Sequence, residues 1–345
     1  MNRPRRALVA RLDNDGDVLL AGPAVRAVAA GADEVVLLSG PRGRQAAGLL
    51  PGVDDVVVWD APWVGYAPPA VKSDDVSEIV ARIARLRCDV GIILTSFHQS
   101  PLPLALLLRL AGVPHLTAVS EDYPGSLLDV RHRVDDDLHE VERALSTVEA
   151  AGFTLPAGDP GTLAVRRPLP PVADLVPGND YVVLHPSASV PARAPSTDHL
   201  VRTARHLSGE LAALGLELVV TGGPDDAALT AAVAAAAGAV DLGARTSYTE
   251  LAAVLAGARA VVVGNTGPAH LAAAVGTPVV SLFAPVVPAA RWAPYGVPTV
   301  LLGDQSAACR LTRARECPVP GHPCLDSISA AEIADAVAKL LAAQA

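Results

Sequence analysis

Residues 260–283 have the sequence AVVVGNTGPAHLAAAVGTPVVSLF. The β-branched run Ala260–Val263 predicts a buried strand, and the Ala/Leu-rich run Leu271–Val275 predicts a helix. The run Val279–Phe283 predicts a second strand. A strand, a helix and a strand in this order form a unit whose two strands are parallel. We therefore predict an α/β fold.

The same alternation of β-branched and Ala/Leu-rich runs continues along the chain. Predicted strands of the first half are Ala7–Leu12, Glu34–Leu38, Asp55–Trp59, Val90–Thr95 and Val113–Val119, separated by helices such as Val18–Ala30 and Val76–Arg87. Further predicted strands of the second half are Tyr181–His185, Leu216–Thr221, Val240–Asp241 and Thr299–Leu302. Both halves therefore predict a parallel sheet covered by helices.

A proline-rich segment, RRPLPPVADLVPG at residues 166–178, separates the two halves. Its four prolines cannot sustain a helix or a central strand. We predict domains at 1–165 and 179–345, joined by this linker, and leave open whether the last helix packs on the first domain. Each domain is expected to be doubly wound and Rossmann-like, and the two to face each other across a cleft at the carboxyl ends of their sheets.

Composition limits the classes of function. Of 345 residues, 51% are hydrophobic and 18% are charged, which excludes a mainly disordered chain. The net charge of −9 repels phosphate backbones, so no nucleic-acid partner is expected. The apolar run after Arg3, Arg5 and Arg6 stops at Arg11, unlike a signal peptide. We expect a cytoplasmic protein without a membrane span, and leave open peripheral contact of the arginine cluster with the inner face of a membrane.

Three carboxylates follow the first predicted strand, in Asp13-Asn14-Asp15-Gly16-Asp17. One interpretation is capping of the next helix, whose first N–H groups donate hydrogen bonds to an Asp oxygen. The other is a general base at the mouth of the cleft, with a pKa raised by repulsion among neighbouring carboxylates. The spacing Asp15-Gly16-Asp17 also matches a metal-chelating D-x-D pattern. The sequence leaves these interpretations open.

Three loops of the second half are small, polar and rich in Gly or Ser, and each follows a predicted strand. Their candidate binding residues are His185, Ser187 and Ser189; Thr221, Gly222, Gly223, Asp225 and Asp226; and Asn265, Thr266, Gly267, Pro268 and His270. In the third loop, free N–H groups and the dipole of the following helix favour a phosphate, with Arg193 as a bidentate partner. The alternative for that loop is an ordinary helix start. Dinucleotide-binding, P-loop and α/β-hydrolase motifs do not occur in these 345 residues.

Two further groups have competing interpretations. Cys309, Cys317, His322 and Cys324 suggest zinc, but they lack the C-x₂-C spacing, and free thiols are the favoured interpretation. Ser96 and His98, after a strand of the first half, are either acceptor-binding residues or ordinary loop residues.

Taken together, these motifs resemble glycosyltransferase family 9, the ADP-heptose:lipopolysaccharide heptosyltransferase family. The resemblance rests on Ala7–Arg26 with its Gly16-Asp17 pair, on His185-Pro-Ser-Ala-Ser, on Thr221-Gly-Gly-Pro-Asp and most strongly on Asn265–Pro285. His139-Glu-Val-Glu-Arg and the cysteine-containing tail are also similar to the family. The resemblance implies a GT-B fold with an acceptor-side first domain and a donor-binding second domain.

The resemblance also implies roles. Asp17 would be the catalytic base that deprotonates an acceptor hydroxyl for attack on the anomeric carbon with inversion. Arg193, at a position usually Lys, would face the donor phosphates, and Asp225 or Asp226 would contact the ribose. Thr266, Gly267 and His270 would hold the diphosphate, with the other loop residues beside them. No metal or cofactor is implied, because helix N–H groups, Arg193 and His270 would stabilise the leaving group.

Two departures from the family pattern concern the donor. Many members have Asp where this chain has Asn265, and the family's Lys-Arg-Trp-Pro segment is Arg193-Ala-Pro-Ser here. We expect a heptose-like sugar on a nucleoside diphosphate, most simply ADP. The alternatives are a GT-B transferase or 2-epimerase that uses UDP- or GDP-sugars, and a non-catalytic sugar-nucleotide-binding protein. The acceptor is a glycan, a lipid-linked glycan or a small molecule, with Asp13, Asn14, Asp15, Gly16, Ser96 and His98 on its side of the site.

Overall fold

A computed structural model describes residues 3–135, 137–178 and 180–344. The chain divides into two compact units between Arg166 and Arg167, at the start of the predicted linker. Each unit is treated by itself below. The proposed domain limits at residues 1, 179 and 345 lie outside the described residues. The segment Arg166–Gly178 contains no described helix or strand.

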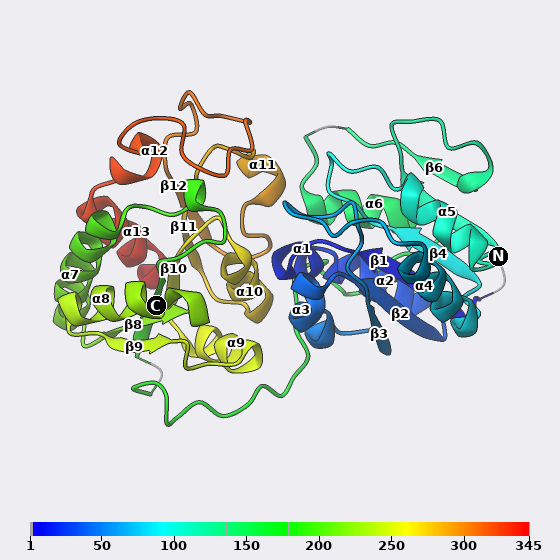
Figure 1. The fold of residues 1–345 in the computed structure, drawn as a ribbon. Helices are drawn as coiled ribbons and strands as arrows, with labels where there is room; N and C mark the ends of the chain where they lie inside the picture. Colours follow the sequence, from blue (N-terminus) through cyan, green and yellow to red (C-terminus); the bar gives the residue numbers. More distant parts are fainter. Residues whose placement is uncertain (1–2, 136, 179, 345) are drawn as a thin grey trace. The chain divides into compact units, whose positions relative to one another are not determined.

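The first unit is built on a parallel sheet with the strand order β3-β2-β1-β4-β5-β6 among its described residues (Figure 1). Its strands are β1 (Arg6–Arg11), β2 (Glu34–Ser39), β3 (Asp55–Val58), β4 (Val90–Ile93), β5 (His115–Val119) and β6 (Val130–His132). Its helices are α1 (Asp15–Leu20), α2 (Gly22–Gly31), α3 (Arg44–Leu49), α4 (Ser73–Leu86), α5 (Leu102–Leu110) and α6 (Glu140–Ala150), with short 3₁₀ turns η1 (Pro41–Gly43) and η2 (Gly125–Leu127).

Two details of the first unit differ from the sequence prediction. The predicted helix Val18–Ala30 is divided at Ala21 into α1 and α2, because Pro23 has no N–H for a helical bond and its ring crowds the carbonyl four residues earlier. The edge strand β6 was not predicted. It has three residues, two of them basic, and shows no periodicity from which a strand could be inferred.

The second unit has the strand order β12-β11-β10-β7-β8-β9, again with every described pair parallel (Figure 1). Its strands are β7 (Tyr181–His185), β8 (Glu217–Gly222), β9 (Val240–Gly243), β10 (Ala260–Gly264), β11 (Val279–Leu282) and β12 (Thr299–Leu302). Its helices are α7 (Thr197–Ala213), α8 (Ala227–Ala237), α9 (Tyr248–Gly257), α10 (Gly267–Val275), α11 (Ala289–Trp292), α12 (Pro323–Asp326) and α13 (Ala330–Ala342), with 3₁₀ turns η3 (Pro191–Arg193) and η4 (Pro224–Asp226). The strands predicted for this half are confirmed.

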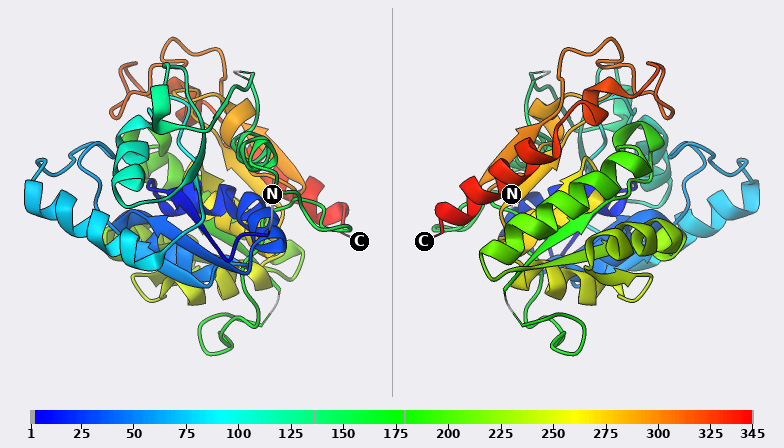
Figure 2. Two further views of the ribbon diagram at one scale, coloured as in Figure 1. Left: turned by 90° about the vertical axis from the view of Figure 1, so that its right-hand side faces the viewer. Right: turned by 90° about the vertical axis from the view of Figure 1, so that its left-hand side faces the viewer.

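The central strands are apolar along their whole length because helices cover them. In the first unit, Leu8 of β1 packs in one cluster with Ile83 of α4 and Leu104 of α5. In the second unit, Val262 of β10 packs with Leu207 of α7 and Val337 of α13. The last helix α13 lies beside α7 and contacts β10, β11 and β12 of the same unit (Figure 2).

Both sheets contain a point where the strand order reverses. In the first unit it lies between β1 and β4, where Ala10 pairs with Ile93. In the second unit it lies between β7 and β10, where His185 pairs with Val263. Connections leave such a point in opposite directions, so a crevice forms beyond the carboxyl ends of the two strands. The predicted functional loops follow these four strands, except the loop with Thr221 and Asp226, which follows the neighbouring strand β8.

The run Leu271–Ala290 is not a transmembrane helix. Its first part belongs to α10 and its middle forms the buried strand β11, as the sequence predicted. None of the described helices combines the length and the apolarity needed to cross a bilayer.

Candidate functional site

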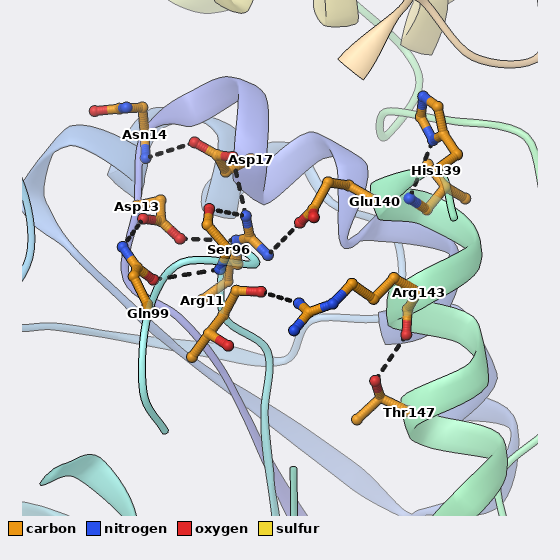
Figure 3. Close-up of polar contacts among 12 residues, drawn as sticks. Arg11, Asp13, Asn14, Asp17, Ser96, Gln99, His139, Glu140, Arg143 and Thr147 are labelled. Atoms are coloured by element: carbon orange, nitrogen blue, oxygen red, sulfur yellow. Dashed lines mark hydrogen bonds and ion pairs between the residues drawn. The ribbon is translucent and has the colours of Figure 1, made fainter. Parts of the chain in front are cut away.

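A buried arginine organises the end of the first sheet. Arg11, the last residue of β1, is 3% exposed and its guanidinium contacts carboxylates from three segments (Figure 3). Nε lies 3.0 Å from Asp13 Oδ2, Nη2 lies 2.9 Å from Asp17 Oδ1, and Nη1 lies 3.2 Å from Glu140 Oε2. Burial opposes the charge of Arg11, yet the three carboxylates together hold its pKa above the ordinary value.

Asp17 is the member of this cluster that reaches the surface. Its side chain is 18% exposed, and Oδ1 accepts a hydrogen bond from Arg11. Oδ2 accepts a long hydrogen bond of 3.4 Å from the backbone N–H of Asn14, which precedes α1. The capping contact is therefore present, but it is weak and it uses one edge of the carboxylate.

Asp15 has a structural partner instead. Its Oδ1 accepts a hydrogen bond of 2.9 Å from the backbone N–H of Ala46 and so joins α1 to α3. Burial raises the pKa of Asp15 to about 6 against the effect of backbone hydrogen bonds, including the one from Ala46. The Asp15 carboxylate therefore caps the first turn of α3 and not the helix that follows the loop, which the capping interpretation concerned.

Asp13 is buried between a cation and an amide. Besides the contact with Arg11, its Oδ1 accepts a hydrogen bond of 2.6 Å from Gln99 Nε2. Burial raises the pKa of Asp13 to about 6, opposed by Arg11 and assisted by the negative charge of Asp17. The prediction of a raised pKa in this loop is confirmed, but its main cause is wrong. Loss of water, more than repulsion, raises the pKa of both Asp13 and Asp15.

The loop after β4 completes this site. Ser96 Oγ accepts a hydrogen bond of 2.9 Å from Arg11 Nη2, and the backbone N–H of Ser96 donates to Gln99 Oε1 at 3.3 Å. Ser96 thus contacts Arg11 beside the carboxylate loop Asp13–Asp17, and its role in acceptor binding stays a prediction. His98 is exposed, and its ring packs edge-on against Phe97.

In the second unit, the ends of β7 and β8 are joined by a chain of hydrogen bonds. His185 Nδ1 lies 2.9 Å from Thr221 Oγ1, and His185 Nε2 lies 3.3 Å from Ser187 Oγ. Ser187 donates its only hydroxyl proton to Asp226 Oδ2 at 2.7 Å. In its contact with His185, Ser187 Oγ is therefore the acceptor, and His185 Nε2 carries the proton. Burial lowers the pKa of His185 to about 4, and the ring is neutral near pH 7.

Asp226 and Asp225 occupy different environments. Asp226 also accepts a hydrogen bond of 2.8 Å from the backbone N–H of Gly223, which orders the 3₁₀ turn before α8. Asp225 and Ser189 are exposed. At Gly222 a Cβ would lie 2.6 Å from a methyl of Thr230, so glycine permits the close packing of this strand end.

The third loop brings Arg193 and the start of α10 together. A Cβ on Gly264 would lie 2.8 Å from the Arg193 carbonyl oxygen, so η3 packs directly against the end of β10. Asn265 is buried, and its Nδ2 has no hydrogen-bond partner among the described residues. Thr266 precedes α10, Gly267 and Pro268 form its first turn, and His270 is buried one turn later. This loop therefore presents polar groups at the switch point of the second sheet.

The cysteine-rich tail does not form a recognisable metal centre. All four cysteines are free thiols, as predicted, and burial together with Cys309 and Cys317 raises the pKa of Cys324 to about 12. His322 Nε2 lies 3.2 Å from the backbone oxygen of Ala192. Throughout the part of the chain that the structure describes, no group of three or more His, Cys, Asp or Glu side chains is arranged to hold a metal ion.

Sequence reasoning did not identify Arg11, Gln99 and Glu140 as site residues. Arg11 had a local signal, since a charged residue at the end of an otherwise apolar strand needs a partner. Glu140 is 129 positions from Arg11, and nothing in its own segment indicates that the two side chains meet.

The environment of Asp13 gives a pH prediction. Its native pKa lies above the ordinary value of 3.8, so its contribution to stability is present below pH 4 and lost as the pH rises through about 6. We expect the Asp13 carboxyl carbon to titrate near pH 6 in NMR spectra of protein labelled with ¹³C at the Asp side chains. The thermal midpoint of Asp13→Asn should fall less between pH 4 and 7 than that of the parent or of the exposed control Asp74→Asn. Titration of Asp13 below pH 4 would contradict this prediction.

Comparisons with known proteins agree with this architecture. The family model of glycosyltransferase family 9 (heptosyltransferase) matches residues 85–322. Similar solved structures are a family 9 glycosyl transferase from Veillonella parvula (17% identity, TM-score 0.77, 99% of both chains) and E. coli ADP-heptose lps heptosyltransferase II (17%, 0.75, 98% of this chain and 99% of that chain). Another is E. coli heptosyltransferase WaaC with ADP-2-deoxy-2-fluoro heptose (21%, 0.69, 99% of this chain and 100% of that chain). A search of curated proteins found no match.

At these identities the solved structures show the fold, which is the GT-B type with two Rossmann-like units. The family model covers well over half of the 345 residues, including the loop after β4, Glu140 and the three loops of the second unit. This chain belongs to glycosyltransferase family 9 and is a glycosyltransferase.

Proposed function

We propose that this enzyme transfers a heptose-like sugar from an ADP-linked donor to an acceptor hydroxyl, with inversion and without a metal ion. The observation that carries the proposal is the placement of Asp17. Its partly exposed carboxylate is held by the buried Arg11 at the switch point of the first sheet. Family membership supplies the reaction class, and this geometry supports Asp17 as the general base of that reaction.

Asp17 would act on the acceptor. Its carboxylate takes the proton of the acceptor hydroxyl as that oxygen attacks the anomeric carbon of the donor. The new C–O bond forms on the face opposite the leaving group, the bond between the sugar and the diphosphate breaks, and the nucleoside diphosphate leaves with the electron pair. Arg11 orients the Oδ1 edge of Asp17 during this step.

The second unit would bind the donor. The N–H groups at the start of α10 and the guanidinium of Arg193 suit a diphosphate, whose charge increases as the sugar leaves. His185 is neutral and Ser187 donates its proton to Asp226, so this part of the site offers oriented dipoles and little net positive charge. The solved relative WaaC with an ADP-heptose analogue supports ADP as the nucleotide.

Nucleotide selectivity tests the donor. We expect ADP to raise the thermal midpoint more than UDP, GDP or CDP at one common concentration, about 100 times the dissociation constant of ADP, where ligand linkage with ADP stabilises by roughly 2.7 kcal/mol. EDTA should leave the ADP effect unchanged. A rise with UDP or GDP alone would refute an ADP donor, and a rise that requires added divalent metal would refute metal independence.

Arg193 is predicted to contact the donor phosphates. Arg193→Ala should weaken ADP binding by about 1.5–3 kcal/mol, the range for a hydrogen bond to a charged group, as measured by isothermal titration calorimetry. The exposed Arg202 of α7 provides the matched control, and Arg202→Ala should bind ADP as the parent does. Equal affinities for the parent and Arg193→Ala would remove Arg193 from the donor site.

Asp17 is predicted to be the base. Asp17→Asn keeps the shape of the side chain but cannot take up a proton, so transfer should slow by about 10²–10⁴-fold while ADP affinity is retained. The assay is ADP release from an ADP-sugar, with and without a panel of sugar acceptors. Asp74→Asn, an exposed carboxylate change in α4, is the control. Full activity of Asp17→Asn would exclude Asp17 as the base.

A further inference from the structure

The side chain of Glu140, the first residue of α6, points toward Arg11, the cation beside the carboxylate loop Asp13–Asp17 (Figure 3). Glu140 follows His139, whose Nδ1 accepts a hydrogen bond of 3.2 Å from the backbone N–H of Val141 and caps the helix. The Glu140 side chain is 1% exposed, and its Oε2 lies 3.2 Å from Arg11 Nη1 (Figure 3). A segment distant in sequence thus contacts the cation that holds Asp17.

The burial of Glu140 requires an explanation. Removal of a carboxylate from water costs several kcal/mol, and a buried ion pair often stabilises a fold no better than apolar residues of similar size. Part of this cost is offset because Glu140 lies at the start of α6, where the helix dipole stabilises a negative charge. The other oxygen, Oε1, is buried and has no hydrogen-bond partner among the described residues. Stability alone is therefore a weak reason for a carboxylate here.

The geometry of Arg11 supplies a better reason. Each nitrogen of the guanidinium faces a different group: Nε faces Asp13, Nη2 faces Asp17 and Ser96, and Nη1 faces Glu140. Because the guanidinium is planar and rigid, fixing Nη1 fixes the direction in which Nη2 points. Glu140 is the contact on the side away from the carboxylate loop.

A second contact joins α6 to the same region. Arg143, one turn after Glu140, donates a hydrogen bond to the backbone carbonyl of Thr95, the residue before Ser96. A cavity of about 10 Å³ lies between these groups, lined by Arg11, Glu140, Arg143 and Thr147 among others. This volume is close to the minimum for one water molecule, so the side chains around it are tightly confined. The helix α6 therefore holds both the end of β1 and the loop after β4.

We propose that Glu140 is a positioning residue of this transferase, anchoring Arg11 from α6 so that Arg11 holds Asp17 in its catalytic orientation. The proposal rests on the proposed function of Asp17 as the base. Asp13 lies near three charged groups, which are Arg11 of β1, Asp17 of α1 and Glu140 of α6. Two neutral residues of the loop after β4 complete the cluster, because Gln99 donates to Asp13 and Ser96 accepts from Arg11. Removal of the Glu140 charge should therefore alter both the orientation and the protonation of this loop.

Glu140→Gln tests the charge, because glutamine has nearly the same shape. The Glu140 charge raises the pKa of Asp13, so its loss should move the NMR titration midpoint of Asp13 to lower pH. Because Asp17 loses its fixed orientation, kcat should fall tenfold or more with ADP affinity unchanged. Glu142→Gln, an exposed change two residues along α6, should leave all of these at the parent values.

Glu140→Asp tests the geometry and covers the case in which glutamine destabilises the unit. Aspartate keeps the charge but is one methylene shorter, so the contact with Arg11 lengthens. We expect kcat to fall while the Asp13 midpoint moves less than in Glu140→Gln. A parent-like kcat in this variant, or parent-like Asp titrations in a folded Glu140→Gln variant, would overturn the positioning role.

These outcomes separate the two proposals. Full activity of Asp17→Asn would refute the base assignment, and an altered Asp13 titration in Glu140→Gln would then show only an electrostatic link between α6 and the loop, overturning a catalytic positioning role. Loss of activity in Asp17→Asn together with parent-like behaviour of Glu140→Gln would leave the proposed function intact and refute the role of Glu140.

Discussion

The architecture of the first unit depends on one buried positive charge, that of Arg11, and on the carboxylates that compensate it. Arg11 lies at the end of a central strand, where water cannot solvate it, and the chain surrounds it with Asp13, Asp17 and Glu140. These partners come from the loop after β1, from α1 and from α6. A buried cation tolerates little displacement of its partners, because a broken contact leaves a charge without solvent. The same constraint therefore fixes the starts of α1 and α6 and the orientation of the three carboxylates around Arg11.

The second unit has a different set of side chains at the equivalent place in its sheet. Its strand ends carry a neutral histidine, hydroxyl groups and glycines, linked through His185, Ser187 and Asp226. Glycine also permits close packing here, since a Cβ on Gly264 would lie 2.8 Å from the Arg193 carbonyl oxygen. A concentrated charge cluster suits removal of a proton from an acceptor, whereas oriented dipoles suit a leaving diphosphate. The proposed division of labour follows from this contrast.

Local patterns predicted much of this structure. Strands such as Ala260–Val263 are continuous apolar runs because both faces of a parallel sheet are covered, and such runs are visible in sequence. Once these strands are located, the polar loops that directly follow them can be recognised as well. The contact between Arg11 and Glu140 could not, because it is set by tertiary packing across 129 positions. The division at Ala21 follows from Pro23, which lies within a run whose apolar periodicity alone predicts one continuous helix.

The three carboxylates of the Asp13–Asp17 loop show why burial, and not residue type, separates their roles. Asp13 is enclosed by Arg11 and Gln99, and Asp15 is occupied by the backbone of Ala46. Neither can meet an incoming hydroxyl without breaking a contact that the fold uses. Asp17 keeps an exposed edge while Arg11 fixes its other oxygen. A base needs both access and a fixed direction, and of the three only Asp17 has both.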